Sequence, residues 1–116
     1  MINNYSYYLS LRNENLEYAE TISKKTVLSE PTNSTYLDTY AWILYKLSRY
    51  DDALIYIKKA IEFGGLQNKV IVEHFGDILY KTNNTDSAVE MWKLAKNLGN
   101  NSINLEQKII NMRINE

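Results

Sequence analysis

The sequence contains no cysteine and a single histidine, His74, among its 116 residues. The absence of cysteine excludes a disulfide framework, thiolate metal sites and thiol catalysis. One histidine excludes a metal site built from several histidines, and its neighbours Glu73 and Asp77 are expected to share a solvated helix face with it. Only four glycines occur, and they form no phosphate-binding loop. These shortages argue against enzyme activity and predict neither a cofactor nor a metal.

The sequence also lacks a surplus of either charge, with thirteen Lys and Arg against fourteen Asp and Glu and a net charge of -1. A protein that binds the phosphate backbone needs excess cations, so nucleic acid is not an expected partner. Asp38, Lys46 and Arg49 interrupt the most hydrophobic region, and no membrane insertion is expected. Residues 1–12 lack the basic start and apolar run of a signal peptide. The sequence leaves the compartment open, including export of a longer parent protein.

An internal repeat is the strongest feature that the sequence does contain. A shift of 35 residues pairs the segment 43–46 with the segment 78–81, residue for residue. The same shift aligns further identical residues: Asp51 with Asp86, Ala53 with Ala88, Lys58 with Lys93, Ala60 with Ala95 and Gly64 with Gly99. Self-similarity at such a period is typical of a helical repeat array.

Each repeated unit reads as two amphipathic helices joined by a polar turn. Apolar residues recur with the spacing i, i+3, i+4 and i+7 that places them on one helical face, as at Leu37, Tyr40, Ala41 and Leu44. The pattern predicts helices over residues 34–48, 51–63, 68–82, 86–98 and 103–113. Two shorter or weaker helices are expected before Glu30. Trp92 should be buried between helices, whereas Trp42 should face an open surface.

The two units resemble tetratricopeptide repeats, helix–turn–helix units of about 34 residues that stack into a right-handed superhelix. The family's pattern positions for large, small and aromatic residues are occupied by Leu37, Tyr40, Ala41, Leu44, Tyr50, Ala53, Ile57 and Ala60, and again by Val72, Phe75, Gly76, Leu79, Thr85, Ala88, Trp92 and Ala95. Thr85 departs from the pattern, and Gly65 and Asn100 replace the closing proline. The resemblance covers nearly the whole chain and is to the C-terminal part of longer bacterial proteins of this family.

The resemblance implies an all-α fold and a single domain over residues 1–116, a right-handed α–α superhelix of stacked repeats with a C-terminal capping helix. Its expected parts are a partial N-terminal repeat at 1–32, repeats at 34–66 and 69–100, and the capping helix at 102–114. Ser102 should cap that last helix. Its Leu105, Ile109 and Met112 are expected to face the array, with Glu106, Lys108 and Arg113 outside.

The resemblance also implies a scaffold that binds a protein or peptide in a groove formed by the first helices of the repeats. The groove positions carried over from the family are Thr35, Asp38, Thr39, Trp42, Tyr45, Lys46, Val70, Glu73, His74, Asp77, Tyr80 and Lys81. Acids at three of them stand beside aromatic residues. Because charge pairing and cation–π contact would act together, a segment bearing Lys or Arg is the expected ligand.

Two alternatives to a binding scaffold remain open at the level of sequence. The chain could be a purely structural end-piece of a longer superhelix. It could also be a module for weak self-association through the partial N-terminal repeat, at Tyr5, Tyr7, Tyr8 and Leu9, because stacked repeats bury their faces on their neighbours.

Overall fold

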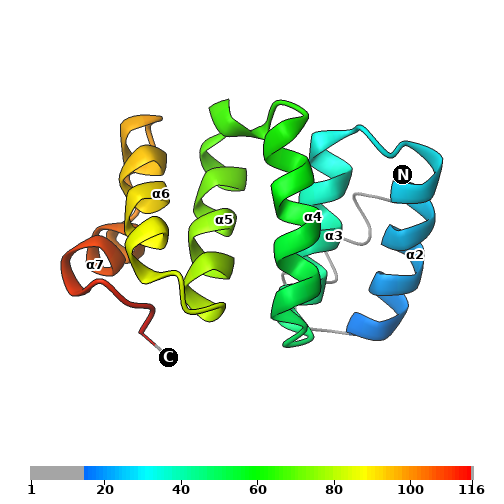
Figure 1. Cartoon of the computed structure of the whole chain (residues 1–116), viewed down its shortest axis with the longest axis horizontal. Coiled ribbons are helices and arrows are strands. Elements are labelled where there is room, and N and C mark those ends of the chain that lie inside the picture. Colours follow the sequence, from blue (N-terminus) through cyan, green and yellow to red (C-terminus); the bar gives the residue numbers. More distant parts are fainter. Residues whose placement is uncertain (1–14, 116) are drawn as a thin grey trace.

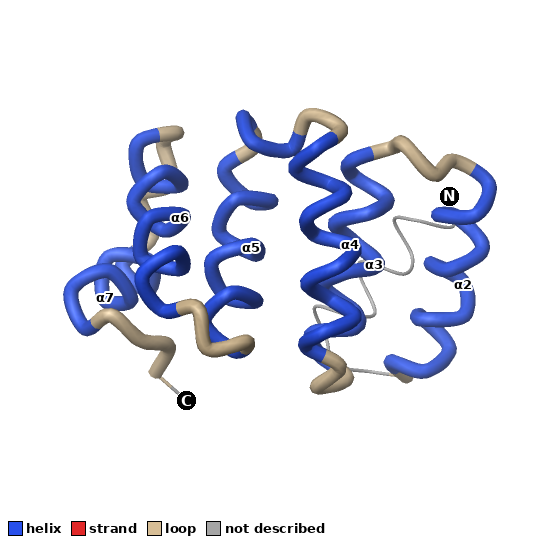
Figure 2. The backbone as a smooth tube through the Cα atoms, in the orientation of Figure 1, coloured by secondary structure: helices blue, strands red, loops and turns tan. Residues whose placement is uncertain are grey.

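The computed structural model describes residues 15–115, and within that range every regular element is helical (Figure 2). The α-helices are α2 (Leu16–Ser29), α3 (Ser34–Lys46), α4 (Tyr50–Glu62), α5 (Lys69–Lys81), α6 (Thr85–Asn97) and α7 (Ile103–Asn111), with a short 3-10 helix η1 (Gly65–Gln67) before α5. The predicted all-α class is confirmed. The residues named for self-association, Tyr5, Tyr7, Tyr8 and Leu9, lie outside the described range.

The helices stand side by side in chain order, from α2 at one end to α7 at the other (Figure 1). Each helix contacts the next one along the chain, and the pairs α3 with α4 and α5 with α6 are the most extensive. The first helices of the two units, α3 and α5, also contact each other directly. This arrangement is a stack of two helical hairpins with one additional helix at each end.

Helix caps and positive φ angles occur at equivalent positions of the two repeated units. The side chain of Asn33 caps α3 by accepting a hydrogen bond from the Tyr36 amide, and Asn68 caps α5 in the same way. Positive φ angles recur at equivalent places in the turns within the units, at Ser48 and Asn83. Gly64 and Gly99 stand two residues after the ends of α4 and α6, with φ of 108° and 105°, a conformation in which other residues are strained.

α2 differs from the weak helix that the sequence predicts before Glu30. It is regular over 14 residues, although Ser23 and Thr26 stand where the repeat family has larger residues or alanine. Ser23 is completely buried and acts as a small packing residue, while the Thr26 hydroxyl donates to the Ile22 carbonyl at 3.2 Å. Ser23 and Thr26 are therefore both compatible with a helix at this place, although neither matches the pattern of the repeat family.

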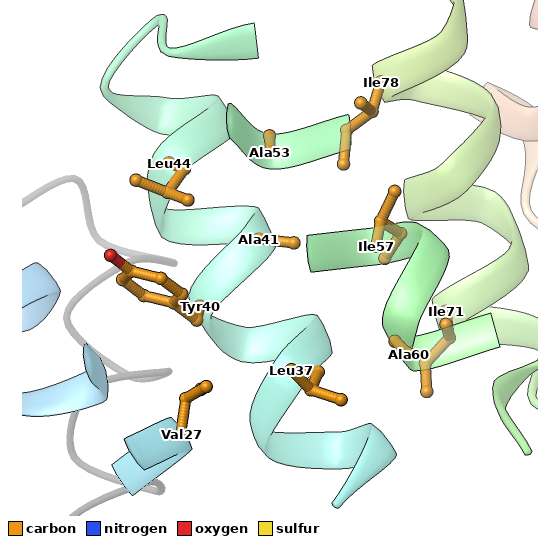
Figure 3. Packing of buried hydrophobic residues seen from close by; sticks show 10 residues of the cluster. All are labelled: Val27, Leu37, Tyr40, Ala41, Leu44, Ala53, Ile57, Ala60, Ile71 and Ile78. Carbon is orange, nitrogen blue, oxygen red and sulfur yellow. The ribbon is translucent and has the colours of Figure 1, made fainter. Parts of the chain in front are cut away.

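The main core lies between α2, α3, α4 and α5 (Figure 3). Ala41, Ala53 and Ala60 are completely buried, and their small side chains allow α3 and α4 to approach closely. Ile71 and Ile78 of α5 reach into the same cluster. The first unit is therefore packed directly against the second, rather than being a separate body.

A second core lies between α5, α6 and α7, with Trp92 at its centre and Leu105 of α7 at its edge. Trp92 is completely buried, which confirms the prediction for this residue. Ser102 caps α7 as predicted, because its hydroxyl oxygen accepts a hydrogen bond from the Leu105 amide at 3.0 Å.

Two of the orientations predicted for α7 are wrong. Lys108 was expected outside but is only 4% exposed, and Met112 was expected to face the array but is 50% exposed. Met112 follows the last helical residue and has a left-handed backbone conformation, with φ of 55°. The helical spacing on which the prediction rests therefore no longer holds at Met112, and the inner face of α7 belongs to Leu105 and Lys108.

Candidate functional site

The predicted groove residues all lie on α3 and α5, but the structure exposes fewer of them than expected. Four of the twelve are buried, namely Asp38, Thr39, His74 and Asp77. Partly buried are Trp42, Tyr45, Lys46, Glu73, Tyr80 and Lys81, and the two that are exposed are Thr35 and Val70. The three acids predicted to meet a ligand do not form an open acidic stripe.

The solvated polar face expected around His74 is wrong, since His74 is buried and bound to Asp38. His74 Nδ1 lies 2.8 Å from the Asp38 carboxylate, so the pair joins α5 to α3. Burial alone would lower the pKa of His74, but the charge and hydrogen bond of Asp38, with smaller contributions from Asp77 and Glu73, outweigh burial and raise it. Asp38 is therefore committed to an internal partner.

Trp42 lies beside this pair and stacks on two neighbouring rings. Its ring centroid is 3.9 Å from that of His74, with 16° between the planes, and 4.5 Å from that of Tyr45, with 8° between the planes. The ammonium of Lys46 lies 5.4 Å from the Trp42 centroid. Trp42 remains partly exposed as predicted, but its orientation is fixed by these contacts.

The aromatic surface continues from α3 to α4 and α5. Tyr45 meets the ring of Tyr50 edge-on at 5.4 Å, and the Lys81 ammonium lies 5.6 Å from the Tyr50 centroid. Burial, with the nearby charge of Asp77, raises the pKa of Tyr45, so its hydroxyl stays protonated at neutral pH. We call Trp42, Tyr45 and Tyr50 the aromatic face.

A second polar cluster joins α5 to α7. The Lys108 ammonium donates to Glu73 at 2.7 Å and to Asp77 at 2.8 Å. The Trp92 indole N–H donates to Asp77 at 3.0 Å, and the Asn100 amide donates to Glu73 at 2.8 Å. Lys108 also lies 5.7 Å from the Trp92 ring centroid. We call Glu73, Asp77, Trp92 and Asn100 the ammonium site.

The charge of Lys108 is maintained in this buried setting. Burial would lower the pKa of Lys108, but the charges and hydrogen bonds of Asp77 and Glu73 outweigh that effect and raise it. Burial also raises the pKa of Asp77, and the Lys108 ammonium opposes this change. The Lys108 ammonium and the Asp77 carboxylate therefore depend on one another for their ionisation.

The sequence analysis missed Lys108 as a member of the candidate site, although a signal for it exists. Lys108 follows Glu73 by 35 residues, which is one repeat period. Extending the repeat into α7 would have placed Lys108 at the position that Glu73 occupies on α5. The position of Lys108 was instead predicted from the apolar spacing of α7 alone, which placed its side chain outside.

Among residues 15–115, no group of three or more His, Asp and Glu side chains is placed to hold a metal ion. The helices of this range also include none that is long and apolar enough to cross a membrane.

Comparison with known proteins finds similar structures but no similar sequences. No protein-family model matches the chain, and no curated protein matches it. The first TPR domain of the human RPAP3 protein is similar in structure, with a TM-score of 0.83 and 11% identity over 96% of this chain and 86% of that one. The first TPR of Spaghetti (RPAP3), bound to the HSP90 peptide SRMEEVD, has a TM-score of 0.84, with the same identity and coverage.

A bacterial structure gives the same result. The Yersinia enterocolitica type III secretion translocator chaperone SycD has a TM-score of 0.75 at 12% identity, over 96% of this chain and 75% of the chaperone. At such low identity these similarities establish the fold alone, which is the right-handed helical repeat of the tetratricopeptide type.

Proposed function

We propose that this chain is a non-catalytic scaffold that binds a protein or peptide segment on the surface formed by α3 and α5. The observation that carries the proposal is the aromatic face. The ring of Tyr45 contacts the rings of both Trp42 and Tyr50, and all three side chains stay partly exposed. Preoriented aromatic side chains offer a large contact area at little entropic cost, and they are enriched where proteins bind one another.

The complex of the structurally similar Spaghetti (RPAP3) domain with an HSP90 peptide supports a peptide as the kind of ligand that this fold accepts. The exposed Thr35 and Val70, at the starts of α3 and α5, extend the proposed surface beyond the aromatic face.

The charge preference of this surface differs along its length. Asp38 is paired with His74, so it does not attract a basic ligand, and Lys46 and Lys81 flank the aromatic face. Glu73 and Asp77 hold the Lys108 ammonium, so a ligand cation would reach these two acids by taking the place of Lys108. We therefore propose that apolar or aromatic ligand residues contact the aromatic face and that a basic residue of the same segment reaches Glu73 and Asp77.

The test compares partner recovery by the full chain and by the double variant Trp42→Ala, Tyr45→Ala in a pulldown from the source cells. Tyr56→Ala is a matched control, because Tyr56 is a partly buried aromatic of α4 that packs on Tyr40 away from the aromatic face. We expect the double variant to lose proteins that the wild type and the control both retain. Equal recovery by a folded double variant, judged by circular dichroism, would reject the aromatic face as the binding surface.

A purely structural role, as an end-piece of a longer superhelix or as a self-association module, is the second candidate. Ile103 and Ile110 lie seven residues apart on α7 and are 77% and 69% exposed. Solenoid helices normally cover such side chains with the next unit. Under this alternative, Ile103→Gln with Ile110→Gln would lower association in sedimentation experiments, while the aromatic-face variants would leave partner recovery unchanged.

A further inference from the structure

We propose that the ammonium site binds a lysine side chain of the partner segment, and that α7 competes with the partner for this site through its own Lys108. The inference rests on the proposed function, because it gives the α3–α5 surface a defined subsite and a means of control. It commits to a short amphipathic segment that carries a lysine as the ligand.

The ammonium site has the parts that a primary ammonium group requires. Glu73 and Asp77 lie one helical turn apart on α5 and approach Nζ of Lys108 at 2.7 and 2.8 Å. Charge-assisted hydrogen bonds of this length are the strong ones. The ring of Trp92 adds a cation–π contact at 5.7 Å. The ammonium of Lys108 occupies this site, which shows that its geometry fits a primary ammonium group.

Both carboxylates are oriented by residues that do not belong to α7. The indole N–H of Trp92, on α6, holds Asp77, and the Asn100 amide, from the loop after α6, holds Glu73. The acceptor geometry therefore does not depend on Lys108 being in place. If α7 moved away, Glu73 and Asp77 would therefore keep their orientation.

The charge balance of the site favours a cation from any source. Two carboxylates face one ammonium, and His74, whose charge also acts on Asp77, is bound to Asp38. A buried ion pair is a weak source of stability, since apolar residues of similar volume often serve as well. The two acids are therefore better explained by their complementarity to a cationic side chain than by a gain in stability.

α7 is the described helix best suited to exchange with a ligand. It has 9 residues, fewer than any other α-helix in the described range. Its fully buried apolar anchor is Leu105, three residues before Lys108, with Ile109 and Ile114 partly buried. A helix with few buried apolar residues opens locally more readily than a core helix. A partner with leucine and lysine in the same spacing would present the same two groups.

The test uses a fluorescent synthetic peptide of the chain's own residues 102–113 as the probe, with binding to the full chain followed by anisotropy. We expect weak binding to the wild type, because the tethered α7 competes at high effective concentration. The Lys108→Met chain should bind the peptide roughly tenfold more tightly, since the charge-assisted bonds are then available only to the peptide. A peptide with methionine in place of its lysine should lose this gain.

Lys96→Met is the matched control. It removes the other ammonium that holds α7, through the exposed pair of Lys96 with Glu106 at 2.9 Å, but leaves the ammonium site filled by Lys108. Its peptide affinity should equal that of the wild type. Equal affinity of the wild-type and Lys108→Met chains, or equal binding of the lysine and methionine peptides, would overturn the proposal.

A second measurement covers the case in which Lys108→Met does not fold. Hydrogen exchange of the wild type with excess peptide should become faster in α7 and stay unchanged in α3, because the peptide displaces α7. Unchanged exchange in α7 at saturating peptide would also overturn the proposal. Since the peptide reports only on the ammonium site, failure here leaves the test of the aromatic face standing.

Discussion

A Cβ atom on Gly76 would lie 2.5 Å from both Cδ1 and Nε1 of the Trp92 ring, closer than real side chains approach. The equivalent pair in the first unit is Ala41 with Ile57, and both are completely buried. The two units therefore fill the same space differently, with the smallest residue beside the largest in one and two intermediate residues in the other. The absence of a side chain at Gly76 therefore leaves the space that the Trp92 ring occupies.

Gly76→Ala should lower the free energy of unfolding, although alanine is favoured over glycine in a helix by about 1 kcal/mol. The clash with Trp92 should outweigh this gain, and a net loss of about 1–3 kcal/mol is expected from overpacking. Adding Trp92→Ile, which reproduces the pair of the first unit, should make Gly76→Ala favourable. Urea denaturation of the four proteins gives the coupling energy, and additive effects would contradict the paired packing.

Trp92→Ala should destabilise the chain by about 3–5 kcal/mol, the usual range for deleting a large core aromatic. Trp42→Ala should cost less, about 1–2 kcal/mol, because Trp42 is partly exposed and loses mainly its stacking contacts with His74 and Tyr45. Both values come from chemical denaturation monitored by circular dichroism. Equal losses for the two tryptophans would mean that the register of α3 is misassigned.

His74 should make stability depend on pH near neutrality. Its pKa is raised above the ordinary 6.5 by Asp38, so the folded state binds the proton more tightly than the unfolded chain. The contribution is therefore complete below pH 6.5 and is lost as the pH rises through the folded-state pKa. Urea denaturation across this range should show a steeper loss for the wild type than for His74→Gln.

The same pKa can be read directly, because the chain has one histidine and its NMR titration is unambiguous. A folded-state pKa at or below 6.5 would refute the account of the Asp38–His74 pair. So would parallel stability profiles for the wild type and His74→Gln.

Lys108→Met should lower the free energy of unfolding by about 3–5 kcal/mol, because it leaves the buried Asp77 and the partly buried Glu73 without their cation. Adding Glu73→Gln and Asp77→Asn should restore much of this loss, since neutral amides tolerate burial better. Lys96→Met, in an exposed pair, should change stability by less than about 1 kcal/mol. Denaturation of the three variants provides the comparison, and equal effects of the two lysines would contradict the assigned burial of Lys108.

The helices of the two repeats could be predicted from sequence to within two residues at each end. Their signals are local, since the apolar spacing of α3, the caps at Asn33 and Asn68 and the glycines after α4 and α6 all act within a few residues. The 35-residue shift then supplied the pairing of units. The burial of Trp92 followed from its position on the inner stripe of α6.

The polar contacts of the candidate site could not be predicted in the same way. Asp38 and His74 both lie off the apolar stripe of their own helices, so each reads as solvated until the neighbouring helix is placed beside it. Lys108 depends on the register of α7, whose spacing breaks at Met112. Such contacts join helices that are one repeat apart. They therefore cannot be predicted from the residue pattern of a single helix.

The ammonium site also limits how the array can be lengthened. Repeat proteins grow, in evolution and in design, by duplication of a unit. A copy of the second unit inserted between α6 and α7 would place a duplicate of Glu73 where Lys108 now lies, beside the original Glu73 and Asp77. Buried like charges repel, so the longer array would form only with a simultaneous change of charge. The two units are therefore not interchangeable modules, and electrostatics fixes their order along the chain.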